Sequence, residues 1–146
     1  MSYTRSYHHI VFGTKRRQKT ILPDRKSRLH RYIAQTIINK KCDPIKIDGM
    51  EEHIHILVDI HPTVALADLV KSVKQSSSKW ISEGLLFPLF EGWASQYYAC
   101  SVSPSHVAVI KEYIENQKIH HSQKGYEREV KDFVEKMGMV LYQDLP

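Results

Sequence analysis

The segment from His53 to Ile60, HIHILVDI, constrains the fold of this chain more than any other. It is almost entirely apolar, yet it carries two imidazoles at a spacing of two residues. Successive side chains of a β-strand point to opposite faces, so His53 and His55 share one face while Ile54 and Ile56 occupy the other. The segment is therefore predicted to be a strand of a sheet whose two faces differ in chemistry.

Two histidines at this spacing direct two nitrogen ligands toward one point, as a divalent-metal site requires. The competing interpretation is a pair of half-buried histidines on a polar sheet face. The dipeptide spacing alone does not separate the two.

The remaining apolar patterns place this strand in an ordered series of elements. Period-two or β-branched runs predict strands at about 7–14, 45–48, 53–60 and 96–103. Period-3.6 runs predict helices at about 24–41, 63–81, 105–121 and 126–137. The order is strand, helix, strand, strand, helix, strand, followed by two helices.

This order predicts an α+β fold of the split β-α-β type, also called ferredoxin-like or RRM-like, with C-terminal helices. Residues 1–146 are expected to form one domain, with a helical extension from about residue 122. Both crossover helices of such a fold cover one face of an antiparallel sheet. We therefore expect His53, His55 and Asp59 to lie on an open face.

Charge is distributed unevenly along the chain. Residues 1–41 contain eleven Lys or Arg and a single acid, whereas residues 42–146 contain ten bases and fifteen acids. This asymmetry favours a bound polyanion, with nucleic acid as the first candidate, over a merely solvated basic surface. The residues expected to contact DNA phosphates are Lys15, Arg16, Arg17 and Lys19 in the loop after the first strand, and Lys71, Lys74 and Lys79 on the second helix.

The sequence also suggests a compartment. Cys42 and Cys100 form no C-x-x-C pattern and indicate no disulfide framework. The N-terminus lacks a signal-peptide core, and no apolar stretch is long enough to cross a bilayer. A cytoplasmic protein without a membrane partner is expected.

A second group of functional side chains lies on the third predicted helix. Tyr113 and Gln117 are four residues apart and share one helical face. A phenol can act as a covalent nucleophile, and a glutamine oxygen can complete a hard-cation site. Alternatively, Tyr113 belongs to a packing stripe with Val109, Ile110 and Ile114.

Taken together, four segments resemble the single-tyrosine HUH transposases, the small transposases of minimal bacterial insertion sequences, and their relatives, the REP-associated tyrosine transposases. The segments are YHHIVFGTKRR, EEHIHILVDI, LVKSVKQSSSKW and YIENQKIHH. The resemblance spans most of the chain, and the combination is specific where each short motif alone is not.

The resemblance implies a metal-dependent enzyme that cleaves and rejoins single-stranded DNA at hairpin-bearing ends through a 5′-phosphotyrosine. It makes Tyr113 the nucleophile and gives His53, His55 and Gln117 the task of holding one Mg²⁺ or Mn²⁺. It also implies a homodimer, whose active sites are either shared between subunits or each formed within one subunit. Glu51, Glu52 and Asp59 are either partners that orient the histidines or strand-end surface charges. No general base is assigned.

Three other functions remain open from the sequence. One is a domesticated nuclease or strand transferase that acts on repeated palindromes. Another is a catalytically idle module that binds single-stranded nucleic acid. The last is a zinc-binding structural protein, for which neither cysteine lies near His53 in the sequence. The extension after residue 122 could seal a dimer, move the tyrosine helix or cover the site.

Overall fold

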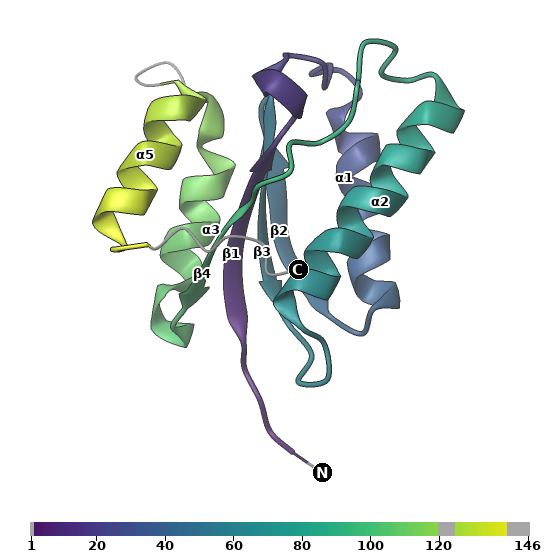
Figure 1. The fold of residues 1–146 in the computed structure, drawn as a ribbon. Helices are drawn as coiled ribbons and strands as arrows, with labels where there is room; N and C mark the ends of the chain where they lie inside the picture. Colours follow the sequence, from purple (N-terminus) through teal and green to yellow (C-terminus); the bar gives the residue numbers. More distant parts are fainter. Residues whose placement is uncertain (1, 120–124, 140–146) are drawn as a thin grey trace.

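A computed structural model describes residues 2–119 and 125–139 of the chain, and its centre is a four-stranded antiparallel sheet (Figure 1). The strands are β1 (Tyr7–Gly13), β2 (Asp43–Gly49), β3 (His53–Asp59) and β4 (Tyr98–Val102). Their order across the sheet is β2-β3-β1-β4. This is the predicted split β-α-β arrangement, with β1 and β3 in the middle.

The register of the central strands separates the two faces of the sheet. Ile54 pairs with Phe12 and Ile56 with Ile10, and these four side chains point to one face. The histidine positions alternate with them, so His53 and His55 point to the other face.

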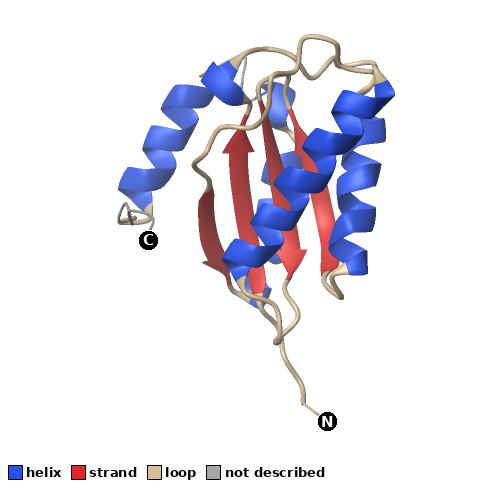
Figure 2. Ribbon diagram, turned by 45° about the vertical axis from the view of Figure 1, so that its right-hand side comes forward, coloured by secondary structure: helices blue, strands red, loops and turns tan. Residues whose placement is uncertain are grey.

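Two helices cover the apolar face (Figure 2): α1 (Lys26–Asn39) and α2 (Leu66–Gly84). Each buries one apolar stripe, which contains Leu29, Ile33 and Ile37 in α1 and Leu69 and Val73 in α2. These residues and the strand isoleucines form the hydrophobic core. Burial of this core is the main favourable contribution to folding.

The histidine face is also covered, which corrects the expectation of an open face. Two helices, α3 (Val107–Glu115) and α5 (Tyr126–Lys136), lie on the side of the sheet opposite α1 and α2 (Figure 1). The prediction was wrong because it used only the two crossover helices of the fold, and the chain adds further helices after β4. The molecule is therefore built as three layers.

The third predicted helix is divided into shorter pieces. A 3₁₀ turn, η2 (Pro104–His106), leads into α3, which ends at Glu115 rather than near residue 121. Asn116 leaves the helical conformation, and residues 117–119 are helical again. Tyr113 and Gln117 therefore lie on either side of a break in the helix, and residues 120–121 lie outside the described part.

Among residues 2–119 and 125–139, no helix is both long enough and apolar enough to cross a bilayer. Cys42 and Cys100 are both free thiols, which agrees with the absence of a disulfide pattern.

Candidate metal and nucleophile site

The two histidines of β3 lie side by side beneath the α3–α5 layer. Both side chains are fully buried, and their ring centroids are 5.0 Å apart. Each is fixed by the strand backbone rather than by a loop, so the rigid sheet sets the separation of the two rings. This agrees with the prediction that His53 and His55 act as a pair.

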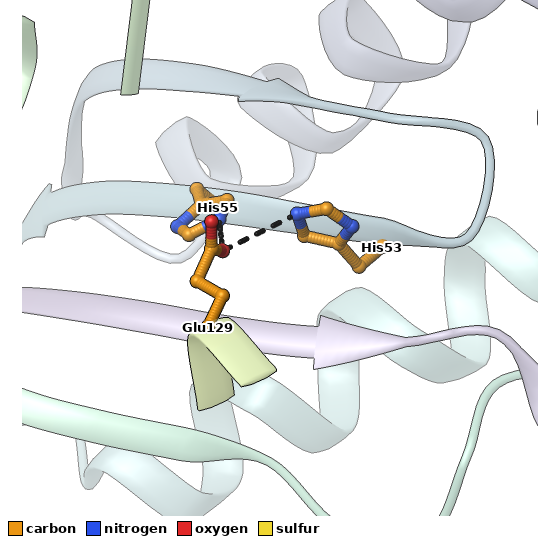
Figure 3. Close-up of side chains that lie close together, drawn as sticks. All are labelled: His53, His55 and Glu129. Atoms are coloured by element: carbon orange, nitrogen blue, oxygen red, sulfur yellow. Dashed lines mark hydrogen bonds and ion pairs between the residues drawn. The ribbon is translucent and has the colours of Figure 1, made fainter. Parts of the chain in front are cut away.

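A carboxylate from α5 points between the two imidazoles (Figure 3). The Oε1 atom of Glu129 lies 2.8 Å from Nε2 of His55 and 3.6 Å from Nε2 of His53. One ligand atom from each of the three residues lies within 4.8 Å of the others. The sequence analysis did not identify Glu129, which is 2% exposed.

Gln117 completes the cluster from the other side. Its Oε1 atom lies 3.1 Å from Nε2 of His53, and its amide nitrogen donates to the carbonyl oxygen of Tyr113 at 3.4 Å. This second bond turns the carbonyl end of the amide toward His53. The structure therefore brings Gln117 beside His53, with its carbonyl oxygen facing the ring.

The donor set fits a divalent cation. Two imidazole nitrogens, a carboxylate oxygen and an amide oxygen converge, and all four atoms offer lone pairs when the histidines are neutral. Lone pairs that face one another in a buried site repel unless a cation or protons lie between them. Hard divalent ions accept this mixture of oxygen and nitrogen ligands.

The electrostatics of Glu129 agree with a site for positive charge. Burial acts to raise the pKa of its carboxyl group. The hydrogen bond with His55 and the charges of His55 and His53 outweigh burial and lower that pKa to about 2. The carboxyl group of Glu129 is therefore ionised at neutral pH.

Tyr113 projects from α3 into the same cluster. Its ring centroid is 5.9 Å from that of His55, and its phenol hydrogen-bonds with Glu129 and Gln117. Burial, followed by the negative charge of Glu129, raises the pKa of this phenol. The predicted nucleophile and the predicted ligands are thus brought together within a single chain.

Helix α5 closes the site from above. The ring of Tyr126 stacks on His53 at 4.3 Å with an interplanar angle of 11°. Phe133 contacts His9, His55 and Tyr113 edge-on. Of the three roles considered for the C-terminal extension, covering the site is therefore the one that this arrangement displays.

A cavity of about 390 Å³ lies beside the closed cluster, between β4, α3 and α5. The residues that line it include His9, Tyr98, Ser101, His106 and Phe133. Its volume is in the range of sites that bind small molecules.

Comparison with known proteins is consistent with this geometry. The family model described as "Transposase IS200 like" matches residues 2–117. The chain belongs to the IS200-like transposase family. The matched region contains His53, His55, Tyr113 and Gln117, whereas Glu129 lies beyond it.

This IS200-like transposase is similar to one curated transposase and to two solved structures. The chain is 25% identical over 115 residues to the ISDra2 transposase TnpA of Deinococcus radiodurans. This alignment covers 75% of this chain and 82% of the relative. A crystallised Deinococcus radiodurans R1 protein described as a transposase has the same fold, with a TM-score of 0.62, 24% identity and coverage of 80% and 95% of the two chains. A REP-associated tyrosine transposase, solved bound to a REP hairpin, has a TM-score of 0.59 at 11% identity, with coverage of 86% and 73%.

The basic loop of the transposase lies at the end of the sheet that holds His53. Gly13 pairs with His53, and the 3₁₀ turn η1 (Lys15–Arg17) follows immediately. Arg16 and Arg17 both have positive φ angles, of 56° and 55°, which is uncommon outside glycine and often found at functional sites. The predicted basic side chains Lys15, Arg16, Arg17 and Lys19 are all exposed.

Two of these arginines form ion pairs with acidic residues. Arg16 pairs with Glu91 at 3.0 Å, and Arg17 pairs with Glu127 of α5 at 2.8 Å. Because both pairs are exposed, a phosphate group can compete with either carboxylate at low energetic cost.

The predicted lysines of α2 are on the opposite side of the sheet from the metal ligands. Lys71 and Lys79 are exposed. Lys74 is used internally: its ammonium donates to the carbonyl oxygen of Ala94 at 2.8 Å and lies 5.4 Å from the centre of the Phe12 ring. Lys74 therefore anchors the chain before β4, which the sequence pattern did not indicate.

The outer nitrogens of the two metal-facing histidines also have partners. Nδ1 of His53 lies 2.8 Å from Oε1 of Glu52, and Nδ1 of His55 lies 2.8 Å from Nε2 of His9. Glu52 was one of three acids considered for this role, whereas Asp59 pairs with Arg5 at the other end of β3. His9 was not considered, although the pair His8-His9 within a strand pattern was a visible signal.

Proposed function

We propose that this IS200-like transposase cleaves and rejoins single-stranded DNA at hairpin-bearing ends through a covalent 5′-phosphotyrosine on Tyr113. The observation that carries the proposal is the position of the Tyr113 phenol, hydrogen-bonded within a buried cluster of His53, His55, Gln117 and Glu129. Family membership supports the transposase activity. The hairpin-bound structure of a protein with the same fold supports the class of substrate.

The chemistry balances without a high-energy cofactor. The phenolic oxygen of Tyr113 attacks phosphorus, the bond from phosphorus to the 3′ oxygen breaks, and the departing oxygen takes up a proton. A 3′-hydroxyl can later attack the phosphotyrosine, which re-forms the phosphodiester and returns the phenol. The number of phosphoester bonds is the same before and after each step.

The proposed cofactor is one Mg²⁺ or Mn²⁺ held by His53, His55, Gln117 and Glu129. Such an ion, when bound, polarises a phosphate oxygen and neutralises charge that develops during displacement. The protein fold sets the positions of these ligands. Strand β3 fixes the two imidazoles, Gln117 contributes its amide oxygen after α3, and Glu129 contributes its carboxylate from α5.

The closed arrangement is a resting form. The raised pKa of Tyr113 keeps its phenol neutral, and neutral phenol is a weak nucleophile. Tyr126 and Phe133 occupy the space above the imidazoles. Access of a phosphodiester to His53 and His55 therefore requires α5 to move, and the cavity beside His9 offers room for a neighbouring nucleotide.

The proposed DNA path runs over η1. Lys15, Arg16, Arg17 and Lys19 are exposed next to the end of β1 that pairs with His53, so a strand bound there is led toward the cluster. Phosphate contacts of this kind supply affinity and position, while unpaired bases provide the sequence information.

Assembly remains a prediction. Tyr113 meets His55 of its own chain, so the cluster needs no second subunit to become complete. A homodimer, with or without exchange of the tyrosine helix, would be detected by sedimentation of the protein with and without hairpin DNA.

The test is a covalent trapping experiment. Wild-type protein is mixed with labelled hairpin-bearing single strands and Mn²⁺, denatured, and analysed for a protein–DNA adduct. We expect an adduct that is absent in Tyr113→Phe and retained in Tyr32→Phe, a matched control because Tyr32 stacks on Trp80 of α2 on the other face of the sheet. Binding without any adduct across varied substrates would instead favour the idle binding module.

A further inference from the structure

Each metal-facing histidine of β3 is held at both ring nitrogens. The Nε2 atoms point into the cluster, toward Gln117 and Glu129. The Nδ1 atoms point outward, toward Glu52 for His53 and toward His9 for His55. An imidazole binds a metal through a nitrogen that carries no proton, so the neutral ring must place its proton on the other nitrogen.

For His53, the outer partner determines the position of the proton. Glu52 is a carboxylate at 2.8 Å that can only accept a hydrogen bond when ionised. The proton of a neutral His53 must therefore lie on Nδ1, which leaves the lone pair of Nε2 directed toward the cluster. Glu52 is buried, so solvent does not compete for this bond.

For His55, the outer partner is another imidazole. The planes of His9 and His55 differ by only 21°, so the lone pair of one ring can meet the N–H of the other close to the plane of both. His9 is buried, and its Nε2 atom lies 2.8 Å from Nδ1 of His55, so a neutral His9 can accept a hydrogen bond there. Phe133 packs edge-on against it and restrains its orientation.

We propose that Glu52 and His9 are positioning residues that fix His53 and His55 in the tautomer with a proton on Nδ1, and so present both Nε2 lone pairs to the metal ion. The proposal rests on the metal site of the proposed function. It adds a second layer of residues drawn from two places: Glu52 precedes β3, and His9 lies in the middle of β1. In the proposed site, neither residue is itself a ligand of the metal ion.

The two partners differ in a way that has a measurable consequence. Glu52 places a carboxylate beside His53, whereas His9 places a second imidazole beside His55. A glutamine at either position keeps an oxygen that accepts from Nδ1, and a phenylalanine or alanine does not. Residues that orient a metal-bound histidine usually change metal affinity by about 10- to 100-fold when lost.

The first experiment is a titration of the DNA-free protein with Mn²⁺, followed by calorimetry. We expect His9→Phe and Glu52→Ala to weaken binding by about 10- to 100-fold, and His9→Gln and Glu52→Gln to recover most of the loss. His8→Phe is the matched control, because the neighbouring imidazole bonds to the carbonyl of Ser6 and does not face the site. It should bind Mn²⁺ like the wild type.

The outcomes separate this inference from the metal site itself. If the wild type binds no Mn²⁺, the metal site fails and the positioning role fails with it. If the wild type binds and the folded His9→Phe protein binds equally well, the positioning role of His9 is wrong while the metal site stands. Loss of affinity in His9→Gln equal to that in His9→Phe would also overturn it, because the accepting oxygen would then have no effect.

A second measurement does not depend on affinity. In ¹⁵N-labelled protein loaded with diamagnetic Zn²⁺, the proton between the two rings should be bound to Nδ1 of His55, with a scalar coupling across the hydrogen bond to Nε2 of His9. The coupling should vanish in His9→Phe. A proton bound to Nε2 of His9 would contradict the proposed tautomer.

Discussion

Glu129 makes two contacts in the cluster, because its Oε1 atom lies 2.8 Å from Nε2 of His55 and its carboxylate hydrogen-bonds to the phenol of Tyr113. Its carboxylate brings the only formal negative charge among the four atoms proposed to hold the ion. A site for a divalent cation gains affinity from ionised ligands, so charge at this position should matter more than shape.

Replacing Glu129 should therefore reduce metal affinity. We expect Glu129→Ala to weaken Mn²⁺ binding at least about tenfold, equivalent to about 1.4 kcal/mol, and Glu129→Gln to lie between it and the wild type. Glu135→Ala is the control, because that carboxylate is exposed on the same helix. Calorimetry on the DNA-free proteins measures the effect, and equal affinities for all four proteins would exclude Glu129 from the ligand set.

His30 of α1 provides a prediction about stability that is independent of the site. Its Nε2 atom is buried and has no hydrogen-bond partner within residues 2–119 and 125–139. Burial lowers its pKa from 6.5 to about 4. The unfolded chain therefore binds a proton more readily than the folded one. The free energy of unfolding therefore has its full value above pH 6.5 and decreases as the pH falls toward 4.

The size of this effect follows from the shift. At pH 5 the folded protein should lose about 2 kcal/mol of unfolding free energy through His30. Urea unfolding measures the free energy of unfolding at pH 7.5 and at pH 5. The difference between the two values should be smaller in His30→Leu than in the wild type, by that amount. Identical pH dependence in the two proteins would contradict the assignment.

At the scale of elements, α5 is attached to the rest of the molecule by unequal contacts. Tyr126 is buried and stacks on His53, and it lies against Gly13, where an added Cβ would be 2.9 Å from the tyrosine ring. The Arg17–Glu127 pair is exposed, and such pairs contribute at most about 1 kcal/mol. Burial of an aromatic ring contributes more, so Tyr126 should dominate the attachment.

Hydrogen exchange of residues 126–136 tests this ranking. We expect Tyr126→Ala to increase exchange throughout α5 by more than about tenfold, and Glu127→Ala by less than about fivefold, since 1 kcal/mol corresponds to about that factor. Exchange in α1 serves as the internal reference and should not change. A larger effect of Glu127→Ala than of Tyr126→Ala would show that the ion pair, rather than the ring, holds the helix.

The comparison of elements also shows what sequence patterns can predict. Strand parity alone places His53 and His55 together, because it depends only on the local backbone. Gln117 and Tyr113 follow from helical spacing in the same way. Glu129 and His9 do not, because their approach depends on how α5 docks and on which residue of β1 lies beside His55. Such contacts are properties of tertiary packing. The histidine pair of β1 is visible in the sequence, but the residue that it meets is not.

At the scale of the whole molecule, the sheet separates two basic surfaces. The arginines of η1 lie at the edge of the metal site, whereas Lys71 and Lys79 lie on α2 behind the sheet. On the proposed DNA path, a strand reaches the cluster past the first surface, and the second surface lies on the far side of the sheet from the cluster.

Salt dependence of DNA binding distinguishes the two surfaces. The double variant Arg16→Ala/Arg17→Ala should weaken binding and reduce the slope of log affinity against log salt concentration by up to about 1.4, since each phosphate contact to a single strand contributes about 0.7. Lys71→Ala/Lys79→Ala, with the same change in charge, should have a smaller effect. Fluorescence anisotropy with a hairpin-bearing strand at several salt concentrations measures both. An unchanged slope in the arginine variant would remove η1 from the DNA path.

Histidine and isoleucine side chains alternate along β3, so the candidate site can form only when β3 pairs with β1 in the native register. A slip of one residue against β1 would turn both imidazoles into the hydrocarbon core and both isoleucines into the ligand cluster. The slipped state would bury two polar rings without partners and lose the packing of the isoleucines in the same event. The residues of the candidate site thus strongly disfavour mispaired chains, because their burial is favourable only in the native register.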